Sequence, residues 1–312
     1  WFYVMVVVTV LLFTELKHTF TELAQRMKND EMITLAKFLA ISGIILPMLP
    51  NENLIPDINL TPYTVWLATV VVSGISYLSY LLRRYVFHES GILVSGIIGG
   101  LYSSTATISV LARKSRKAPA QEAPEYAAAM LLAVSMMFLR FLILIGIFSK
   151  AILAEIYPYL LIMSFVTAGV AWYLHRKRKS IPVTGEEAEE EDSSNPLEFK
   201  VALIFAVLFV IFTIVTHYTL IYTGTGGLNV LSFIAGLSDI TPFILNLLQG
   251  SGVAVVVVTA CCMQAIVSNI AVNMCYALFF AGGKSPLRRW VLRGFGGVIA
   301  VNVCLLLFFY LL

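Results

Sequence analysis

Charge is scarce in this chain. Only 12% of its 312 residues are charged, whereas 59% are apolar, and the mean hydropathy is +0.87. Soluble globular domains carry about 25% charged residues, so this composition excludes that class. The sequence therefore predicts an all-α integral membrane protein, in which each helix satisfies its own backbone hydrogen bonds within the lipid.

Cysteine and histidine are also few, with four of each. The cysteines all lie in apolar segments without CxxC spacing, which favours small core residues over metal or redox ligands. The histidines show no metal-ligand spacing and no nearby nucleophile pattern. We therefore expect no enzymatic activity, no cofactor and no nucleic-acid partner. The cysteines are Cys261, Cys262, Cys275 and Cys304, and the histidines are His18, His88, His175 and His217.

Long apolar runs predict about eight transmembrane helices, because a helix needs about 20 residues to cross the hydrocarbon core. Residues 15–32 between the first two runs are polar with spaced apolar positions, which fits either a helix lying on the membrane surface or a solvated connector. The predicted helices cover residues 1–14, 33–49, 63–82, 126–149, 152–174, 199–222, 253–282 and 290–312.

One further motif occurs twice. The stretch GILVSGIIGGLYSSTATISVLA at residues 91–112 aligns without a gap to GLNVLSFIAGLSDITPFILNLL at residues 227–248. In each copy an apolar run reaches a glycine, then small hydroxyl or acidic residues, then a second apolar run. This pattern is typical of two half-helices that are broken in the middle of the membrane.

The basic residues indicate how these motifs cross the membrane. All except Arg140 and Lys150 lie in connectors that the positive-inside rule assigns to the cytoplasm. Basic groups flank the 91–112 motif on both sides, whereas the 227–248 motif is flanked by YTGTGG and QGSG, which lack charge. Two re-entrant hairpins, one entering from each face, would reconcile these positions. The alternative is that both motifs simply span, since 22 residues are long enough.

The hairpins imply an inverted-topology duplication. Residues 1–32 would hold the end of an upstream helix and a cytoplasmic connector. Residues 33–149 would form the first repeat, with hairpin 91–112, and residues 150–282 the second, with hairpin 227–248. Residues 175–197, basic and then strongly acidic, are predicted to be a cytoplasmic linker, and residues 283–312 a final transmembrane helix.

Ionisable residues within the predicted membrane segments are few. Arg140 lies well inside a predicted helix, and Asp239 lies at the break of the second hairpin. Such residues are costly in lipid and are functional candidates by default. The two could share an ion, or could form a buried pair that only fixes the packing.

The breaks themselves carry small polar residues. We expect these to cap the second half-helices, whose free N–H groups would suit an anion, while the carbonyls that end the first halves would suit a cation. Asn269 and Asn273, four residues apart, share one helix face and are either interhelical contacts or pore lining. The complete candidate set is Ser103, Ser104, Thr105, Thr107, Arg140, Asp239, Thr241, Asn269 and Asn273, with Asp239 as the candidate metal ligand.

Several runs together resemble the C-terminal membrane domain of bacterial MgtC/SapB-type proteins, the domain of unknown function 4010. They are GIIGGLYSSTATISVLARKS, ILPMLP, SMMFLR, GLSDITPF and VSNIAVN. The resemblance implies a bacterial inner-membrane location, an upstream MgtC-like domain and a link to magnesium homeostasis. Asn273 stands where the family leads us to expect a basic residue, and Thr241 where an acidic one is common. Both departures weaken a cation-coordinating role.

These features together predict a multi-pass cell-membrane transporter or channel for a small ion, bound at the midplane between the two hairpins. The first substrate expected is a divalent cation such as Mg²⁺, and the second is a small anion. The alternative is a membrane scaffold or regulator of ion homeostasis that transports nothing. Lipid and a small ion are the expected partners, and a homo-oligomer is left open.

Overall fold

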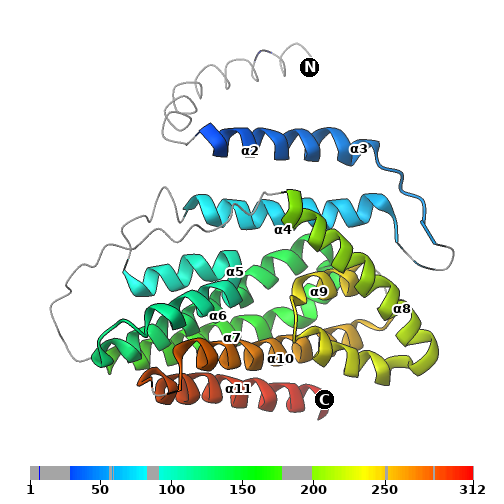
Figure 1. Ribbon diagram of the computed structural model, residues 1–312. Coiled ribbons are helices and arrows are strands. Elements are labelled where there is room, and N and C mark those ends of the chain that lie inside the picture. Colours follow the sequence, from blue (N-terminus) through cyan, green and yellow to red (C-terminus); the bar gives the residue numbers. More distant parts are fainter. Residues whose placement is uncertain are drawn as a thin grey trace. The chain divides into compact units, whose positions relative to one another are not determined.

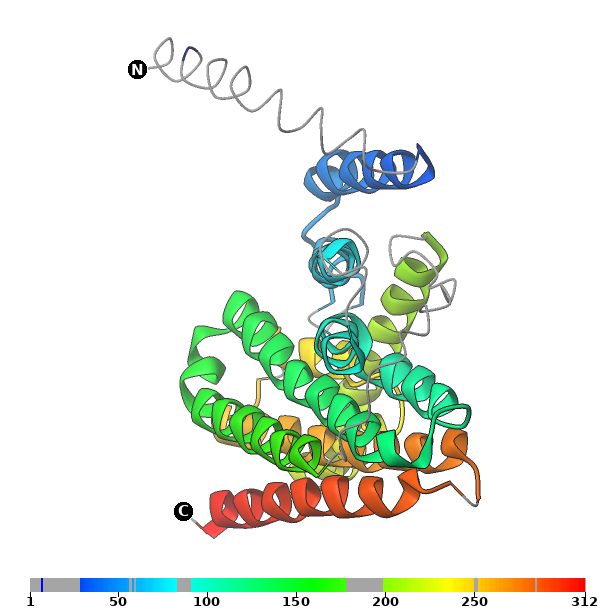
Figure 2. The ribbon, with the colours of Figure 1, turned by 90° about the vertical axis from the view of Figure 1, so that its left-hand side faces the viewer.

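The computed structural model describes residues 7, 29–55, 58, 60–82, 91–177, 199–249, 252–283 and 285–311. The chain divides into two compact units, Trp1–Leu49 and Pro50–Leu312. The helix expected at 1–14 lies outside the described residues apart from Val7, as do most of the connector 15–32 and most of the linker 175–197. Figures 1 and 2 show the elements of the chain from two directions.

In the first unit the described residues form one helical run. It consists of α2 (Asn29–Ala40), a π-helical turn η1 (Ile41–Ile45) and α3 (Leu46–Met48). The helix expected at 33–49 therefore exists, although it begins earlier and carries a wider turn in its middle.

The second unit contains seven helices that are long and apolar enough to cross a membrane, among the residues that the structure describes. Apart from one isolated bridge between Ile55 and Ile58, this described part has no strand. The protein is thus an all-helical, multi-pass membrane protein. The long helices are α4 (Pro62–Leu81), α5 (Ile92–Lys114), α6 (Ala123–Phe148, after a short turn η3, Ala120–Glu122), α7 (Lys150–Arg176), α8 (Phe199–Ala235), α10 (Val255–Ala281) and α11 (Leu287–Leu311), and α9 (Ile240–Leu248) is shorter.

Local sequence explains several helix boundaries. Thr61 caps α4, because its hydroxyl accepts the Thr64 N–H while the Thr64 hydroxyl accepts the Thr61 N–H, and Pro62 supplies the first turn. Ser149 ends α6 and also caps α7, where its side chain accepts the N–H of Ile152. A single residue thus joins two long antiparallel helices.

Helix α8 consists of two helical limbs. The helix expected to end at Tyr222 is followed at Gly224 by a break in the helical backbone, and a second limb then runs to Ala235. Gly224 has φ 65° and ψ −155°, a conformation that a side chain would strain. The glycine-rich run therefore connects two helical limbs through a tight reversal, as the charge-free connector predicted.

Helix α6 lies at the centre of the second unit. It contacts α5, α7, α9 and α11, and α10 in turn contacts α5, α7, α8 and α11. The views in Figures 1 and 2 show α6, α7, α10 and α11 packed side by side. Residues 127–131 of α6 are completely buried, and three of them are alanines, so neighbouring backbones can approach closely.

Candidate functional site

Helix α5 is broken at Ser103. This residue has φ −158° and ψ 110°, and its hydroxyl accepts the N–H of Ala106 at 3.3 Å, so it caps a second half-helix. A Cβ atom added to Gly99 would lie 2.5 Å from Oγ1 of Thr107. In a continuous helix, residues eight positions apart are separated by about 12 Å. The two halves of α5 therefore fold against each other at the break.

Two glycines allow the first half of α5 to pack closely against α6. A Cβ atom on Gly96 would clash with the backbone of Ala129, and one on Gly100 would lie 2.5 Å from Cα of Ala133. Backbone atoms cannot move aside as a flexible side chain can. Glycine at these two positions is thus required by the close approach of α5 to α6.

The second break lies between α8 and α9. Asp239 has φ −75° and ψ 111°, and its Oδ1 accepts the Thr241 N–H at 3.0 Å, which makes it the cap of α9. Pro242 follows in the first turn of α9, where the N–H that proline lacks would have no intrahelical acceptor in any case. A Cβ atom on Gly236 would lie 2.7 Å from the Ala265 carbonyl oxygen of α10. The capping role expected for the small polar residues is confirmed at Ser103 and Asp239.

The two breaks correspond in the duplicated motif. In the gapless alignment Ser103 falls on Asp239, and Gly100 falls on Gly236. Both members of the first pair cap a half-helix, and both members of the second pack against the helix that follows their own motif. The sequence similarity therefore coincides with similar local geometry.

Arg140 of α6 reaches the first break. Its Nη1 donates to the carbonyl oxygen of Tyr102 at 2.8 Å, and its Nη2 lies 3.5 Å from Oγ of Ser76 on α4. The Nε atom is buried without a hydrogen-bond partner. Asp239 attracts the guanidinium electrostatically, but these two described residues form no ion pair within 4.0 Å. The direct pair that we considered as a packing element is thus absent from the described structure.

A chain of side-chain hydrogen bonds joins the two breaks. Thr105 Oγ1 donates to Oδ1 of Asn273 at 2.9 Å, and Asn273 Nδ2 donates to Oδ1 of Asn269 at 3.1 Å. Asn269 Nδ2 in turn lies 3.3 Å from the carbonyl oxygens of Gly236 and Ser238. Asn273 is completely buried, and Asn269 is 5% exposed. The two amides of α10 therefore link the first break, two residues past its cap, to the residue just before the second cap.

The remaining candidates lie near these groups. Ser104 and Thr107 are buried in the second half of α5, where Thr107 faces Gly99 of the first half. Thr241 is buried at the start of α9. Asp239 itself is exposed. Among the described residues, no group of three or more histidine, cysteine or acidic residues is placed to hold a metal ion.

Sequence reasoning missed Ser76. Helix α4 buries Thr69, Ser73 and Ser76 at intervals of four and three residues, a spacing that places them on one helix face. That polar stripe was readable in the sequence and could have identified α4 as a neighbour of Arg140. Gln264, which lies off the line of the two asparagines, belongs to a different cluster with Ser232 and Tyr310.

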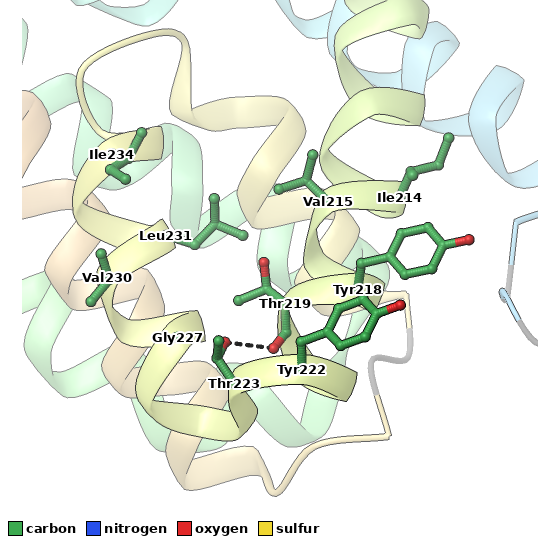
Figure 3. Close-up of a pocket in the computed structure, with 10 residues that line it drawn as sticks. All are labelled: Ile214, Val215, Tyr218, Thr219, Tyr222, Thr223, Gly227, Val230, Leu231 and Ile234. Atoms are coloured by element: carbon green, nitrogen blue, oxygen red, sulfur yellow. Dashed lines mark hydrogen bonds between the residues drawn. The ribbon is translucent and has the colours of Figure 1, made fainter.

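A crevice of about 630 Å³ opens between the two limbs of α8. Figure 3 shows Tyr218 and Tyr222 on one limb and Val230 and Ile234 on the other. Its lining is almost entirely apolar, without a charged residue and without any member of the candidate set. The crevice therefore offers few polar partners to a charged ligand.

Comparison with known proteins places these residues in a family. The family model described as "Domain of unknown function (DUF4010)" matches residues 70–281, a span that includes both breaks, Arg140 and both asparagines. The chain belongs to the DUF4010 family. This part of the sequence-based resemblance is confirmed, whereas membership of the MgtC/SapB-type proteins stays a prediction.

A relative of this DUF4010 protein occurs in Aquifex aeolicus (strain VF5), where it is named "Uncharacterized protein". The two sequences are 26% identical over 201 residues, which cover 62% of this chain and 84% of the relative. No solved structure matches the chain.

Proposed function

We propose that this DUF4010 protein moves a small ion across the membrane through a site where its two helix breaks meet. The observation that carries this proposal is the hydrogen-bonded chain from Thr105 through Asn273 and Asn269 to the carbonyl of Ser238. Buried polar groups are expensive in a bilayer and mark ion pathways when they gather around broken helices.

The directions of the half-helices support a re-entrant arrangement. Helix α5 ends beside the end of α10, because Arg116 donates to the carbonyl of Phe279. Helix α9 instead ends at Leu248, just before α10 begins at Val255. The half-helices that start at the two caps therefore run toward opposite ends of α10. Two inverted hairpins, each entering from its own face of the membrane, would have this geometry.

Contacts between the halves of the sequence support the inverted repeats. The first broken helix, α5, contacts α10 of the second half, and α9 of the second half contacts α6 of the first. Helix α4, which precedes the first motif, contacts α8, which contains the first half of the second motif. Each hairpin would thus be held partly by the other repeat, and rocking of one repeat against the other would open the site to alternate faces. A fixed path past the same residues would make a channel.

Both signs of charge are near the site, and Asp239 keeps the divalent cation, the first substrate expected from the sequence, among the candidates. Its carboxylate is exposed at the break, and hydrated Mg²⁺ needs only one or two such ligands. A role in magnesium homeostasis would agree with this candidate, and it comes from the resemblance to MgtC/SapB-type proteins.

The direct test is flux. The full chain would be purified, reconstituted into liposomes and assayed for Mg²⁺ and for chloride, with protein-free liposomes as the baseline. We expect flux of at least one ion, and a change in its rate in Arg140→Gln or Asp239→Asn. If neither ion crosses faster than in empty liposomes, the protein is better described as a scaffold or regulator.

Cysteine labelling tests the arrangement separately. In a background where the four native cysteines are replaced by serine, Tyr102→Cys and Ser238→Cys would be probed with impermeant reagents from each side. Arg116→Cys marks the predicted cytoplasmic face and Thr225→Cys the outer face. We expect Tyr102→Cys to react from the cytoplasmic side and Ser238→Cys from the outside. Reaction of both from one side would rule out two oppositely inserted hairpins.

A further inference from the structure

We infer that the substrate is a small inorganic anion and that the Nε–H group of Arg140 is its principal contact. This inference rests on the proposed transport function and adds the sign of the ion. It follows from counting which hydrogen-bonding groups at the two breaks are already occupied and which are left.

The acceptors that a cation would need are largely in use. The Tyr102 carbonyl, which ends the first half of α5, accepts from Arg140. At the second break Asn269 donates to the carbonyls of Gly236 and Ser238. A partly dehydrated cation is held by such carbonyl oxygens, and here each of them already accepts a side-chain N–H, which reduces its capacity to coordinate a cation.

The side-chain oxygens between the breaks are occupied in the same way. Oδ1 of Asn273 accepts from Thr105, and Oδ1 of Asn269 accepts from Asn273. Asp239 retains acceptor capacity, although one of its oxygens already caps α9. The central polar groups are therefore arranged with their donors directed at their own acceptors.

Some hydrogen-bond donors at the first break have no acceptor in the protein. Nε of Arg140 is buried and unpartnered, while the two terminal nitrogens of the same guanidinium are tethered to Tyr102 and Ser76. The tethers fix the orientation of the group, so the free N–H is held in place before a ligand arrives. Among the first N–H groups of the half-helix after Ser103, that of Ala106 is taken by the cap and the others have no intrahelical acceptor. The positive end of this half-helix also favours negative charge.

Asp239 sets the strength of binding. Its charge attracts Arg140 from the other hairpin without a direct ion pair, so it lowers the positive potential that an anion meets. A transported ion must bind weakly enough to leave. Removing this charge while retaining the cap, as Asn does, should tighten anion binding.

Binding can be measured without flux. The midpoint of thermal unfolding of the purified full chain would be recorded in sodium chloride, bromide and nitrate, against sodium gluconate at equal ionic strength and against magnesium gluconate. A ligand at concentration c that binds the folded state stabilises it by RT ln(1 + c/Kd), so this midpoint rises with the logarithm of the ligand concentration once that concentration exceeds Kd. We expect the small anions to raise it and gluconate salts to leave it unchanged.

The variants assign the effect to Arg140. Arg140→Gln should abolish the anion-dependent shift, and Arg140→Lys, which keeps the charge but lacks Nε, should weaken anion affinity roughly tenfold. Asp239→Asn should strengthen it. Arg289→Gln, which removes an exposed cation at the start of α11, is the matched control and should leave the shift intact. If Arg140→Gln does not fold, the lysine variant decides.

Unchanged anion affinity in Arg140→Lys would overturn the inference, as would stabilisation by magnesium gluconate alone. Different results would contradict the transport proposal and the anion-binding inference. Flux of Mg²⁺ without anion binding would contradict the anion and leave transport standing, whereas anion binding without flux of any ion would contradict transport and leave the binding site standing.

Discussion

The two helix breaks use the same backbone device with different side chains. The first is capped by Ser103, a neutral residue, and the carbonyl before the cap is satisfied by a cation, Arg140. The second is capped by an anion, Asp239, and the carbonyl before it is satisfied by a neutral amide, Asn269. The charged group therefore lies in the supporting helix at one break and in the cap at the other.

This difference shows which parts of the duplicated motif are structural and which are free to vary. Both breaks need a cap, a donor for the last carbonyl and a glycine against the next helix, and both have all of these. The sign and position of the charge are not needed to build a break. Because they differ between the copies, Arg140 and Asp239 are the residues to which we assign function.

The largest effect should come from the glycines. Gly100→Ala places a Cβ atom 2.5 Å from Cα of Ala133, and neither backbone can yield without separating α5 from α6. We expect a loss of about 2 kcal/mol or more of folding stability, measured as a lower midpoint of thermal unfolding in detergent. Gly236→Ala, whose Cβ atom would meet the Ser268 Cβ and the Ala265 carbonyl oxygen of α10, should lose a similar amount.

Gly169→Ala is the control for both substitutions. It lies in the middle of α7, and a Cβ atom there would meet nothing within 4 Å. Alanine also favours a helix over glycine. Its midpoint should therefore stay the same or rise slightly, and an equal fall in all three variants would mean that helix packing at the breaks is not special.

The amides should come next. Asn269→Ala removes the donor for the carbonyls of Gly236 and Ser238 and the acceptor for Asn273, so buried polar groups are left unpaired at a loss of about 1–3 kcal/mol. Asn273→Ala removes the acceptor for Thr105 and the donor to Oδ1 of Asn269. We expect the first variant to loosen the second break and the second variant to loosen the first.

Hydrogen–deuterium exchange can separate these two outcomes. Faster exchange should be confined to α9 and the residues before it in Asn269→Ala, and to α5 in Asn273→Ala. A double-mutant cycle between Thr105→Val and Asn273→Ala should show coupling, because the two side chains bond directly. Additive effects would mean that this contact contributes nothing to stability.

The features that the sequence predicted correctly are local ones. A hydroxyl or carboxyl side chain before an apolar run is the mark of a helix cap, so Ser103 and Asp239 could be found without a structure. Arg140 stood out because charge within lipid is rare. The shared face of Asn269 and Asn273 followed from their spacing, and their hydrogen bond confirms it.

The features that were missed depend on partners distant in sequence. Nothing near Thr105 indicates that its hydroxyl bonds to Asn273, 168 residues later. The polar stripe of α4 was overlooked because a serine side chain in a membrane helix commonly donates to a backbone carbonyl of the same helix, as Ser79 does. The reversal at Gly224 was readable because three glycines lie at 224–227, although the sequence did not show that only Gly224 would have a positive φ.

The smallest effect should come from the caps, and it bears most directly on the difference between the breaks. Ser103→Ala and Asp239→Ala each remove one side-chain acceptor and should lower stability by about 1 kcal/mol. Asp239→Asn should lose little, because asparagine caps equally well, and yet it removes the only charge in either cap. In the thermal unfolding assay, the midpoint of Asp239→Asn should therefore match that of the wild type, while the midpoint of Asp239→Ala falls as that of Ser103→Ala does.

If the midpoint of Asp239→Asn falls as far as that of Asp239→Ala, the negative charge itself stabilises the second break through the helix dipole or Arg140. The charge then has a structural role, as the Ser103 hydroxyl does. If the midpoint does not fall, the charge does not contribute to folding stability, and a change in ion binding in Asp239→Asn reports on function without a contribution from stability.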